Sequence, residues 1–186
     1  MSPATPSPAR PALRRHLVLM GLRASGKSTL GAAAATALGA PFVDLDDRTR
    51  ALLGQPTVRD AFTIAGEQAF REAESAALRT ALTESPQVIA LGGGTPTAPG
   101  AAAAIEAARR SGLALVVFLD PPLELLAQRL AAHEGDRPSL TGRGVVAEIE
   151  EVARVRRPLY AALADLRVLE PLAPEALVSI MTSQVS

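Results

Sequence analysis

The residues best suited to chemistry begin with a glycine-rich loop, GLRASGKS, at positions 21–28. Its spacing matches G-x-x-x-x-G-K-S/T, and it stands directly after an apolar run and directly before a helical pattern, the context that this motif requires. The backbone N–H groups of such a loop wrap nucleotide phosphates, with the positive end of the helix dipole behind them. Lys27 can neutralise the β- and γ-phosphate oxygens, and the Ser28 hydroxyl can ligate Mg²⁺. The loop therefore predicts binding of ATP or GTP.

Acidic residues follow the second predicted strand, in the stretch Asp44-Leu-Asp46-Asp47. In a parallel sheet this end of the strand faces the bound nucleotide. Alternation along the strand is expected to place Asp44 and Asp46 on the same side. One carboxylate could hold Mg²⁺ through water, and the other could hydrogen-bond and deprotonate an attacking hydroxyl. The alternative is structural, because Asp46 or Asp47 could cap the helix that follows.

Two further polar segments come later in the chain. The stretch AGEQAFREAE at 65–74 carries charge pairs at the i,i+3 and i,i+4 spacings of a surface helix. Gly92, Gly93 and Gly94 end another apolar run, where three glycines cost backbone entropy and would weaken an ordinary turn. Such a turn is suited to a backbone that must approach a ligand with no Cβ in the way, and the alternative is a flexible loop.

Apolar runs and helical patterns alternate along the chain. Strands are expected at 16–20, 41–45, 87–91, 114–119 and 166–169, and helices at 28–38, 57–82 with a break near Gly66, 101–110, 122–132, 145–163 and 174–182. Continuously apolar strands that alternate with helices indicate an α/β fold, with a parallel sheet covered on both faces. The polar segments fall at the carboxyl ends of these strands, where such sheets bind ligands, or in the glycine-containing segment 133–144.

The composition fits one globular domain of 186 residues, 48% of them hydrophobic and 20% charged. A formal net charge of zero gives no general attraction to nucleic acid or to an anionic membrane, and no apolar run reaches the length of about 20 residues that a span requires. Lys27 is the only lysine among 19 basic residues, which suggests that its position needs a compact ammonium. Residues 1–15 are expected to be a disordered tail without a secretory signal, which leaves 16–186 as a single domain and the cytoplasm as the default location.

Taken together, these segments resemble the shikimate kinase family across about residues 16–170. The matching motifs are the loop 21–28, Asp44 and Asp46, the Gly-Glu-x-x-Phe-Arg-x-x-Glu segment at 66–74, the glycines at 92–94, the Arg-Pro-x-Leu segment at 137–140 and the Arg-x-Pro-Leu-Tyr segment at 156–160. The resemblance implies a P-loop fold of the nucleoside monophosphate kinase type, with three αβα layers and a five-stranded parallel sheet in the order 2-3-1-4-5. It further implies a lid at about 133–144 and shikimate-binding helices at about 46–82. The implied reaction is Mg²⁺-dependent transfer of the γ-phosphoryl group of ATP to the 3-hydroxyl of shikimate, on the route to chorismate and the aromatic amino acids.

The resemblance also implies a role for individual residues. Asp46 would bind the shikimate hydroxyls and assist proton removal, and Asp44 would contact Mg²⁺ through water, beside Ser28. Arg71 and Arg156 would clamp the shikimate carboxylate, a task suited to planar guanidinium groups. The remaining implied contacts are Gly21, Ala24, Ser25, Gly26, Lys27, Ser28 and Thr29 with the phosphates, Arg129 with adenine, Arg137 of the lid with the transferring phosphoryl group, and Gly92, Gly93 and Gly94 with the acceptor. Lys27, Asp46 and Arg137 are thus the predicted catalytic residues of a monomeric enzyme.

The chain departs from the family at a few positions. Ala24 replaces a usual glycine, Leu169 and Glu170 replace polar residues near the adenine site, and the segment between Arg129 and Arg137 is slightly longer. Gluconate kinases and adenylate-type kinases share the fold but carry other acceptor-helix and arginine signatures. A non-catalytic nucleotide-binding relative would be expected to have lost a catalytic residue, and all of them are present. His16 and His133 have no partner pattern and are interpreted as structural or exposed.

Overall fold

The computed structural model describes residues 13–132 and 145–183 of the chain. The elements follow in the order β1 (His16–Gly21), α1 (Lys27–Leu38), β2 (Phe42–Asp44), α2 (Leu45–Leu52), α3 (Val58–Thr83), β3 (Val88–Ala90), the 3₁₀ turn η1 (Thr95–Thr97), α4 (Ala101–Arg110), β4 (Ala114–Leu119), α5 (Leu123–Ala131), α6 (Val145–Leu163), β5 (Leu166–Val168) and α7 (Pro174–Ser183). Strands and helices therefore alternate as the sequence predicts, and the bounds of the predicted elements differ by a few residues at most, while α2 was not among the helices expected from the sequence pattern.

The strands form one sheet in the order β2-β3-β1-β4-β5, and each neighbouring pair is parallel. β1 is central, with Leu17 opposite Val88 of β3 on one side and opposite Leu115 of β4 on the other. This order confirms the predicted 2-3-1-4-5 topology. Because the strands are parallel, all their carboxyl ends meet at one edge of the sheet, where the glycine-rich loop follows β1 and the triple glycine follows β3.

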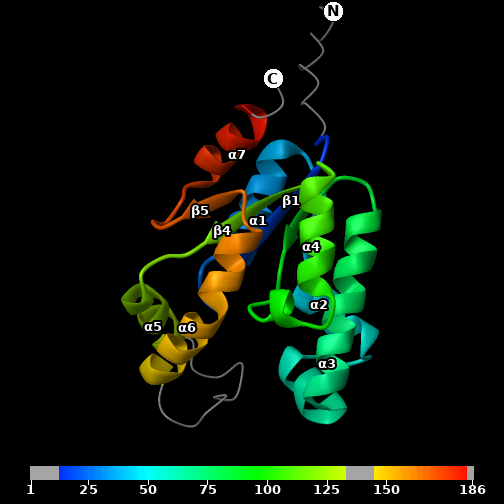
Figure 1. Cartoon of the computed structure of the whole chain (residues 1–186), viewed down its shortest axis with the longest axis vertical. Helices are drawn as coiled ribbons and strands as arrows, with labels where there is room; N and C mark the ends of the chain where they lie inside the picture. The colour runs from blue at the N-terminus through cyan, green and yellow to red at the C-terminus, as the bar shows by residue number, and fades with distance from the viewer. Residues whose placement is uncertain (1–12, 133–144, 184–186) are drawn as a thin grey trace, which may run out of the picture.

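Helices cover both faces of the sheet and make three layers (Figure 1). Alternate residues of β1 point to opposite faces. Leu17 and Leu19 pack in a core with buried residues of α1 and α7, whereas Val18 and Met20 pack in a second core with residues of α3, α4 and α6. A strand buried on both sides has no polar face, which explains the continuous apolar run in the sequence. Within the described residues, no helix is both long and apolar enough to cross a membrane.

The region around β2 differs from the prediction. β2 ends at Asp44, and α2 begins at once with Leu45, so Asp46 lies in the first turn of a helix and not in the strand. The argument from strand alternation is therefore wrong. The side chain of Asp44 caps α2 by accepting a hydrogen bond from the backbone N–H of Asp46 at 3.0 Å, so the capping role falls to Asp44 and not to Asp46 or Asp47.

Two other local features position the site. The helix predicted at 57–82 is one element with a break at Gly66, whose φ of 82° and ψ of 163° are not helical, and Thr57 caps its N-terminus. The short turn η1 was not predicted, since the proline in its three-residue sequence and the glycines before it obscure a helical pattern. Both features turn the chain at the edge of the sheet where ligands are expected.

Candidate active site

The glycine-rich loop joins β1 to α1 at the carboxyl edge of the sheet. Lys27 is the first residue of α1 and is buried. Its Nζ donates hydrogen bonds to the Leu22 carbonyl at 2.9 Å and to Ser25 Oγ at 3.4 Å, so the ammonium group lies over its own loop. The lysine, the loop backbone and the N-terminus of α1 together form the phosphate-binding geometry that the motif predicts.

Ala24 is the one non-glycine residue of the described chain with a positive φ, which is 61°. A left-handed conformation is strained for an L-residue, which explains why glycine suits this position better. Arg129 of α5 donates a hydrogen bond to the Ala24 carbonyl at 3.0 Å. Arg129 therefore lies over the phosphate loop, and its predicted stacking on adenine stays a prediction.

The two residues predicted to serve the metal are in direct contact. Ser28 Oγ donates a hydrogen bond of 2.5 Å to Asp44 Oδ2. A hydroxyl and a carboxylate are the oxygen ligands that Mg²⁺ prefers, and nucleotide-bound Mg²⁺ usually takes only one or two protein groups beside phosphates and water. The pair fits that donor set, although the described residues hold no cluster of three acids or histidines.

The half-buried carboxylate of Asp46 reaches the triple glycine. A Cβ atom on Gly92 would lie 2.5 Å from Asp46 Oδ1 and 2.8 Å from Glu74 Oε1. Any side chain at this position would collide with both carboxylates, so a glycine is needed where they converge. A chain of neighbours thus runs from Ser28 of the phosphate loop through Asp44 and Asp46 to the triple glycine.

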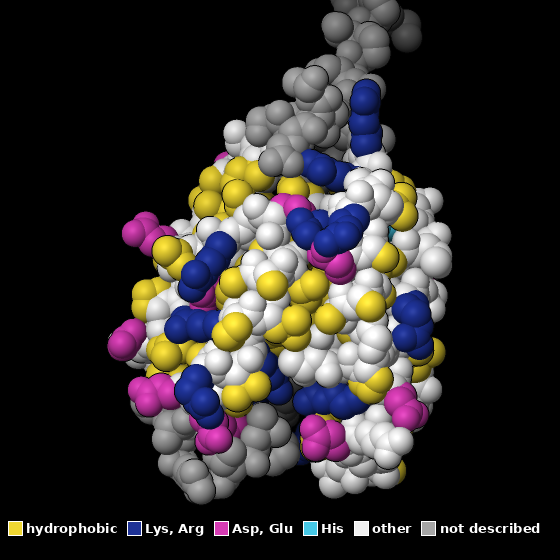
Figure 2. Space-filling view, viewed as in Figure 1, with side chains coloured by type: hydrophobic (Ala, Val, Ile, Leu, Met, Phe, Trp, Pro, Cys, Tyr) yellow, Lys and Arg dark blue, Asp and Glu magenta, His cyan; other side chains and the backbone are white. Residues whose placement is uncertain are grey.

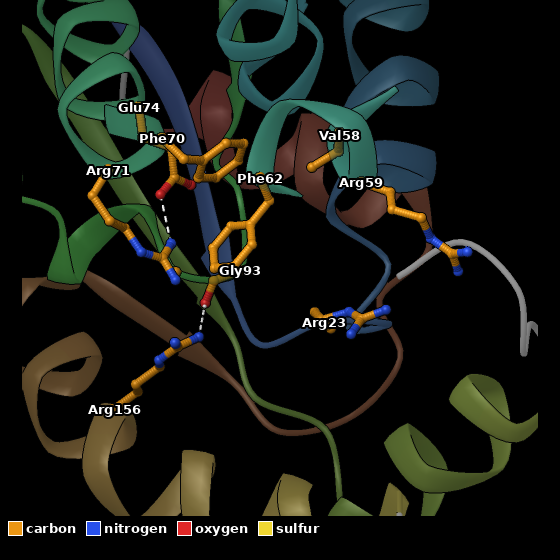
Figure 3. Close-up of a pocket in the computed structure, with 10 residues that line it drawn as sticks. Arg23, Val58, Arg59, Phe62, Phe70, Arg71, Glu74, Gly93 and Arg156 are labelled. Carbon is orange, nitrogen blue, oxygen red and sulfur yellow. Dashed lines mark hydrogen bonds and ion pairs between the residues drawn. The ribbon is translucent and has the colours of Figure 1, made fainter. Parts of the chain in front are cut away.

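A pocket whose empty volume, counted with the space open to solvent, is about 560 Å³ lies beside this point. In the space-filling view, dark blue Lys and Arg side chains flank a hollow between the lower parts of α6 and α3 (Figure 2). The pocket is lined by Arg23, Val58, Arg59, Phe62, Phe70, Arg71, Glu74, Gly93, Gly94 and Arg156 (Figure 3). Two aromatic rings and several guanidinium groups suit a small ring that carries an anionic group.

Arg71 is held by a glutamate for which the sequence analysis proposed no role. Arg71 donates to Glu74 Oε2 at 2.6 Å, and Thr95 Oγ1 donates to Glu74 Oε1 at 2.9 Å. The Glu74 side chain is only 2% exposed, and this burial raises its pKa above the ordinary value even though Arg71 and Thr95 act in the opposite direction. The sequence could have indicated this ion pair, because an arginine followed three residues later by a glutamate lies on the same face of a helix.

The second predicted arginine enters from α6. Arg156 donates to the Gly93 carbonyl at 2.9 Å, and the fully buried Tyr160 donates to the same oxygen at 2.8 Å. Burial raises the pKa of Tyr160 to about 12, so its hydroxyl stays a donor. Arg71 and Arg156 thus come from different elements and meet at the triple glycine, and their clamping of a carboxylate stays a prediction.

Asp120, at the end of β4, fixes α6 against the sheet. Its carboxylate, 1% exposed, accepts from Arg157 Nε at 2.7 Å and from Arg167 Nε at 2.9 Å. Arg157 is the chain neighbour of Arg156, so this buried contact positions the residue that enters the pocket. The sequence analysis assigned no role to Asp120, since nothing in the chain order relates it to 157 or 167.

Some predicted residues are not placed. Arg137, His133 and the predicted lid at about 133–144 lie outside the described residues, and the role of Arg137 stays a prediction. His16 is buried at the start of β1, and this burial lowers its pKa, which agrees with a structural role.

Comparisons with known proteins agree with this geometry. The family described as shikimate kinase matches residues 23–185. A shikimate kinase of Nitratidesulfovibrio vulgaris is 42% identical over 154 residues, covering 80% of this chain and 83% of that protein. Shikimate kinase 2 of Syntrophotalea carbinolica is 39% identical over 166 residues, covering 88% and 92%. The structure of Acinetobacter baumannii shikimate kinase in complex with shikimate superposes with a TM-score of 0.77 at 26% identity, covering 92% of this chain and 90% of that one. The chain therefore belongs to the shikimate kinase family and has the fold and phosphate loop of an ATP-dependent kinase.

Proposed function

We propose that the protein transfers the γ-phosphoryl group of ATP to the 3-hydroxyl of shikimate. The observation that carries this proposal is the continuous set of contacts from Ser28 of the phosphate loop to Asp46 and on to the triple glycine, with Arg71 and Arg156 beside it. Such an arrangement suits a general base that acts between a nucleotide and an acceptor. The family membership of the chain supports shikimate as that acceptor.

Different pocket residues would contact different parts of the acceptor. Arg71 and Arg156 would hold the carboxylate, while Phe62 and Phe70 pack edge to face with ring centroids 5.4 Å apart and give the ring an apolar wall. Binding the carboxylate at one end of shikimate would position the hydroxyl groups at its other end near Asp46. The reacting groups are then held together and do not have to meet by diffusion. Gly92, Gly93 and Gly94 would let the ring approach the backbone.

The reaction then needs one proton transfer and one substitution at phosphorus. The carboxylate of Asp46 accepts the proton of the 3-hydroxyl, whose oxygen forms a bond to the γ-phosphorus as the bond from phosphorus to the leaving oxygen of ADP breaks. Lys27 and the loop N–H groups neutralise charge that develops on the phosphate oxygens. Ser28 and Asp44 would hold Mg²⁺, which when bound neutralises further charge on the β- and γ-phosphates.

The test is ADP release from MgATP, measured in a coupled assay with shikimate, with gluconate and with no acceptor. We expect release that depends on shikimate and that falls by about 10²–10⁴-fold in Asp46→Asn, the usual contribution of a general base. Asp47→Asn is the matched control, because Asp47 is 65% exposed and forms an ion pair with Arg50 of the same helix. Rapid turnover with gluconate would favour a gluconate-type kinase instead. Absence of turnover with every acceptor, despite ATP binding, would favour a non-catalytic nucleotide-binding protein.

A monomer in the cytoplasm, with no nucleic-acid or membrane partner, stays the prediction from the sequence. It rests on the family resemblance and on the zero formal net charge. Sedimentation of the purified protein would test the first part.

A further inference from the structure

Thr95 places a buried hydroxyl group behind the wall of the acceptor pocket. It is the first residue of η1, directly after the triple glycine, and it is completely buried. It does not belong to the residues that line the pocket. Any effect of this hydroxyl on a bound acceptor therefore has to pass through another side chain.

The Thr95 hydroxyl reaches the carboxylate that holds Arg71. Thr95 Oγ1 donates to Glu74 Oε1 at 2.9 Å, while Arg71 donates to the other oxygen, Oε2, at 2.6 Å, the contact drawn as a dashed line in Figure 3. The two oxygens of one buried carboxylate thus have different donors. Because Thr95 holds Oε1, the carboxylate cannot rotate freely, and Oε2 stays directed at the guanidinium group of Arg71.

A second carboxylate approaches the same point. A Cβ atom on Gly92 would lie 2.8 Å from Thr95 Oγ1 and 2.8 Å from Glu74 Oε1. The same atom would lie 2.5 Å from Asp46 Oδ1. Two carboxylates that converge on one point repel each other, which disfavours the ionised form of the buried one. A hydroxyl donor at Glu74 Oε1 opposes this repulsion, so it favours the ionised glutamate that Arg71 needs as a partner.

The turn itself does not depend on this hydroxyl. The backbone N–H of Thr95 donates to the Gly92 carbonyl at 3.1 Å, and the Thr95 carbonyl accepts from the N–H of Ala98 at 2.9 Å. Both hydrogen bonds use the main chain and would survive replacement of the side chain. The contact with Glu74 can therefore be removed without removing the bonds that form η1.

We propose that Thr95 is a positioning residue for acceptor binding, which acts through Glu74 on Arg71. This inference rests on the proposed function, since it assumes that Arg71 binds the carboxylate of the acceptor. The hydroxyl orients the Glu74 carboxylate, and the carboxylate orients Arg71. The guanidinium group lies so close to the triple glycine that a Cβ atom on Gly94 would overlap its Nη1. Loss of the hydroxyl weakens acceptor binding without removing a group that touches the acceptor.

The experiment is steady-state kinetics of the full chain, with shikimate varied at saturating MgATP. Thr95→Val keeps the branched shape and removes the hydroxyl, whereas Thr95→Ser keeps the hydroxyl. We expect Thr95→Val to raise the KM for shikimate by about three- to tenfold and to change kcat by less than about twofold, the pattern of lost substrate binding. Thr95→Ser is expected to recover most of the loss. In a Glu74→Gln background Thr95→Val should add less than about twofold, because the residue through which it acts is already altered.

Thr97→Val is the matched control on the same turn. The exposed Thr97 hydroxyl donates to the Gly94 carbonyl at 2.6 Å, and its backbone N–H keeps that carbonyl paired at 2.9 Å. We expect its KM for shikimate to equal that of the unsubstituted protein. An unchanged KM in Thr95→Val, or no recovery in Thr95→Ser, would overturn the proposal. Thr95→Ala removes the same hydroxyl with a smaller side chain, so a folding defect in one variant leaves the other to decide.

NMR titration of the Glu74 carboxyl carbon tests the contact without any acceptor, and the resonance is assigned by its absence in Glu74→Gln. Burial raises the pKa of Glu74, the nearby Asp46 of α2 raises it further, and Arg71 and Thr95 lower it. Tyr160 of α6 also faces this carboxylate.

Thr95→Val is therefore expected to raise the pKa of Glu74 above that of the unsubstituted protein, and an unchanged titration would contradict the proposal. Shikimate-dependent ADP release by the unsubstituted protein tests the proposed function by itself. Failure of that assay and failure of the positioning role are accordingly distinct results.

Discussion

Glu74→Gln separates the stability of the fold from the function of the acceptor pocket. Glu74 is buried between Arg71, which donates to it at 2.6 Å, and Thr95, which donates at 2.9 Å. Glutamine keeps the shape of the side chain and one carbonyl acceptor, but it removes the negative charge. The variant therefore resembles the protonated form of the glutamate.

Two opposing contributions set the expected change in stability. Loss of the charge-assisted hydrogen bond to Arg71 costs about 1.5–3 kcal/mol. Removing an ionised group that has been withdrawn from water restores several kcal/mol of desolvation. The raised pKa of Glu74 shows that burial outweighs the attraction of Arg71. We therefore expect the free energy of unfolding of Glu74→Gln at neutral pH to equal that of the wild type or to exceed it by about 1 kcal/mol, a rise in Tm of about 2–4 °C.

The pH dependence of stability follows from the same raised pKa of Glu74. Because the pKa of Glu74 is higher in the folded than in the unfolded chain, the folded state binds more protons in the interval between the two values. The free energy of unfolding of the wild type therefore falls as pH rises from the ordinary glutamate value of 4.5 through the raised pKa. Glu74→Gln lacks this group, so the two proteins should have similar stability below the interval and should diverge above it.

In contrast to stability, the binding of shikimate is expected to weaken in Glu74→Gln. Without its carboxylate partner Arg71 loses its fixed orientation, and we expect the KM for shikimate to rise about tenfold with a smaller change in kcat, the pattern of lost substrate binding. Thermal unfolding followed by circular dichroism across the interval, with steady-state kinetics, measures both effects. Glu72→Gln is the matched control on the same helix, since Glu72 is exposed and contacts Gln68. A loss of about 3–5 kcal/mol with no divergence in pH, the cost of an isolated buried charge, would refute the argument that burial dominates at Glu74.

Two further substitutions test the geometry around the loop and the triple glycine. Ala24→Gly relieves a φ of 61°, which costs an alanine about 1–2 kcal/mol, while glycine adds about 0.4–1 kcal/mol of unfolded-state entropy. We expect a net gain of about 0.5–1 kcal/mol in urea unfolding, and a loss would show that the loop is not strained. Tyr160→Phe removes one hydrogen bond to the Gly93 carbonyl, which keeps its bond from Arg156. The expected loss is about 1 kcal/mol by the same method, and a loss well above this would mean that Arg156 does not satisfy that carbonyl.

Much of the fold could be predicted because its signals are local. The buried strands are continuous apolar runs, and the sheet order followed from the family resemblance that the loop, the glycines and the arginine motifs established. The break at Gly66 was also predictable, since glycine in a helical pattern marks a conformation that other residues avoid. The loop, the clamp arginines and the triple glycine were accordingly found at one edge of the sheet.

Long-range partnerships were not predictable in the same way. The pairing of Asp120 with Arg157 and Arg167 joins positions 37 and 47 residues apart, and no periodicity links them. The lining of the pocket by Arg23 and Arg59 likewise depends on how α3 folds back toward the loop. Such contacts come from tertiary packing, which a single sequence does not encode as a spacing.

Asp44 and Asp46 come close together for a different reason than the one predicted. Strand alternation was expected to bring Asp44 and Asp46 to one side, but the strand ends at Asp44 and the two residues are related by a helix cap. One carboxylate oxygen of Asp44 accepts from Ser28 of the phosphate loop, and the other accepts from the backbone of Asp46. The cap therefore ties the predicted metal-binding pair to the predicted base through a single side chain. Phosphoryl transfer requires the metal, the phosphate and the base in one fixed geometry, and the cap restricts the orientation of the Asp44 carboxylate relative to the first turn of α2.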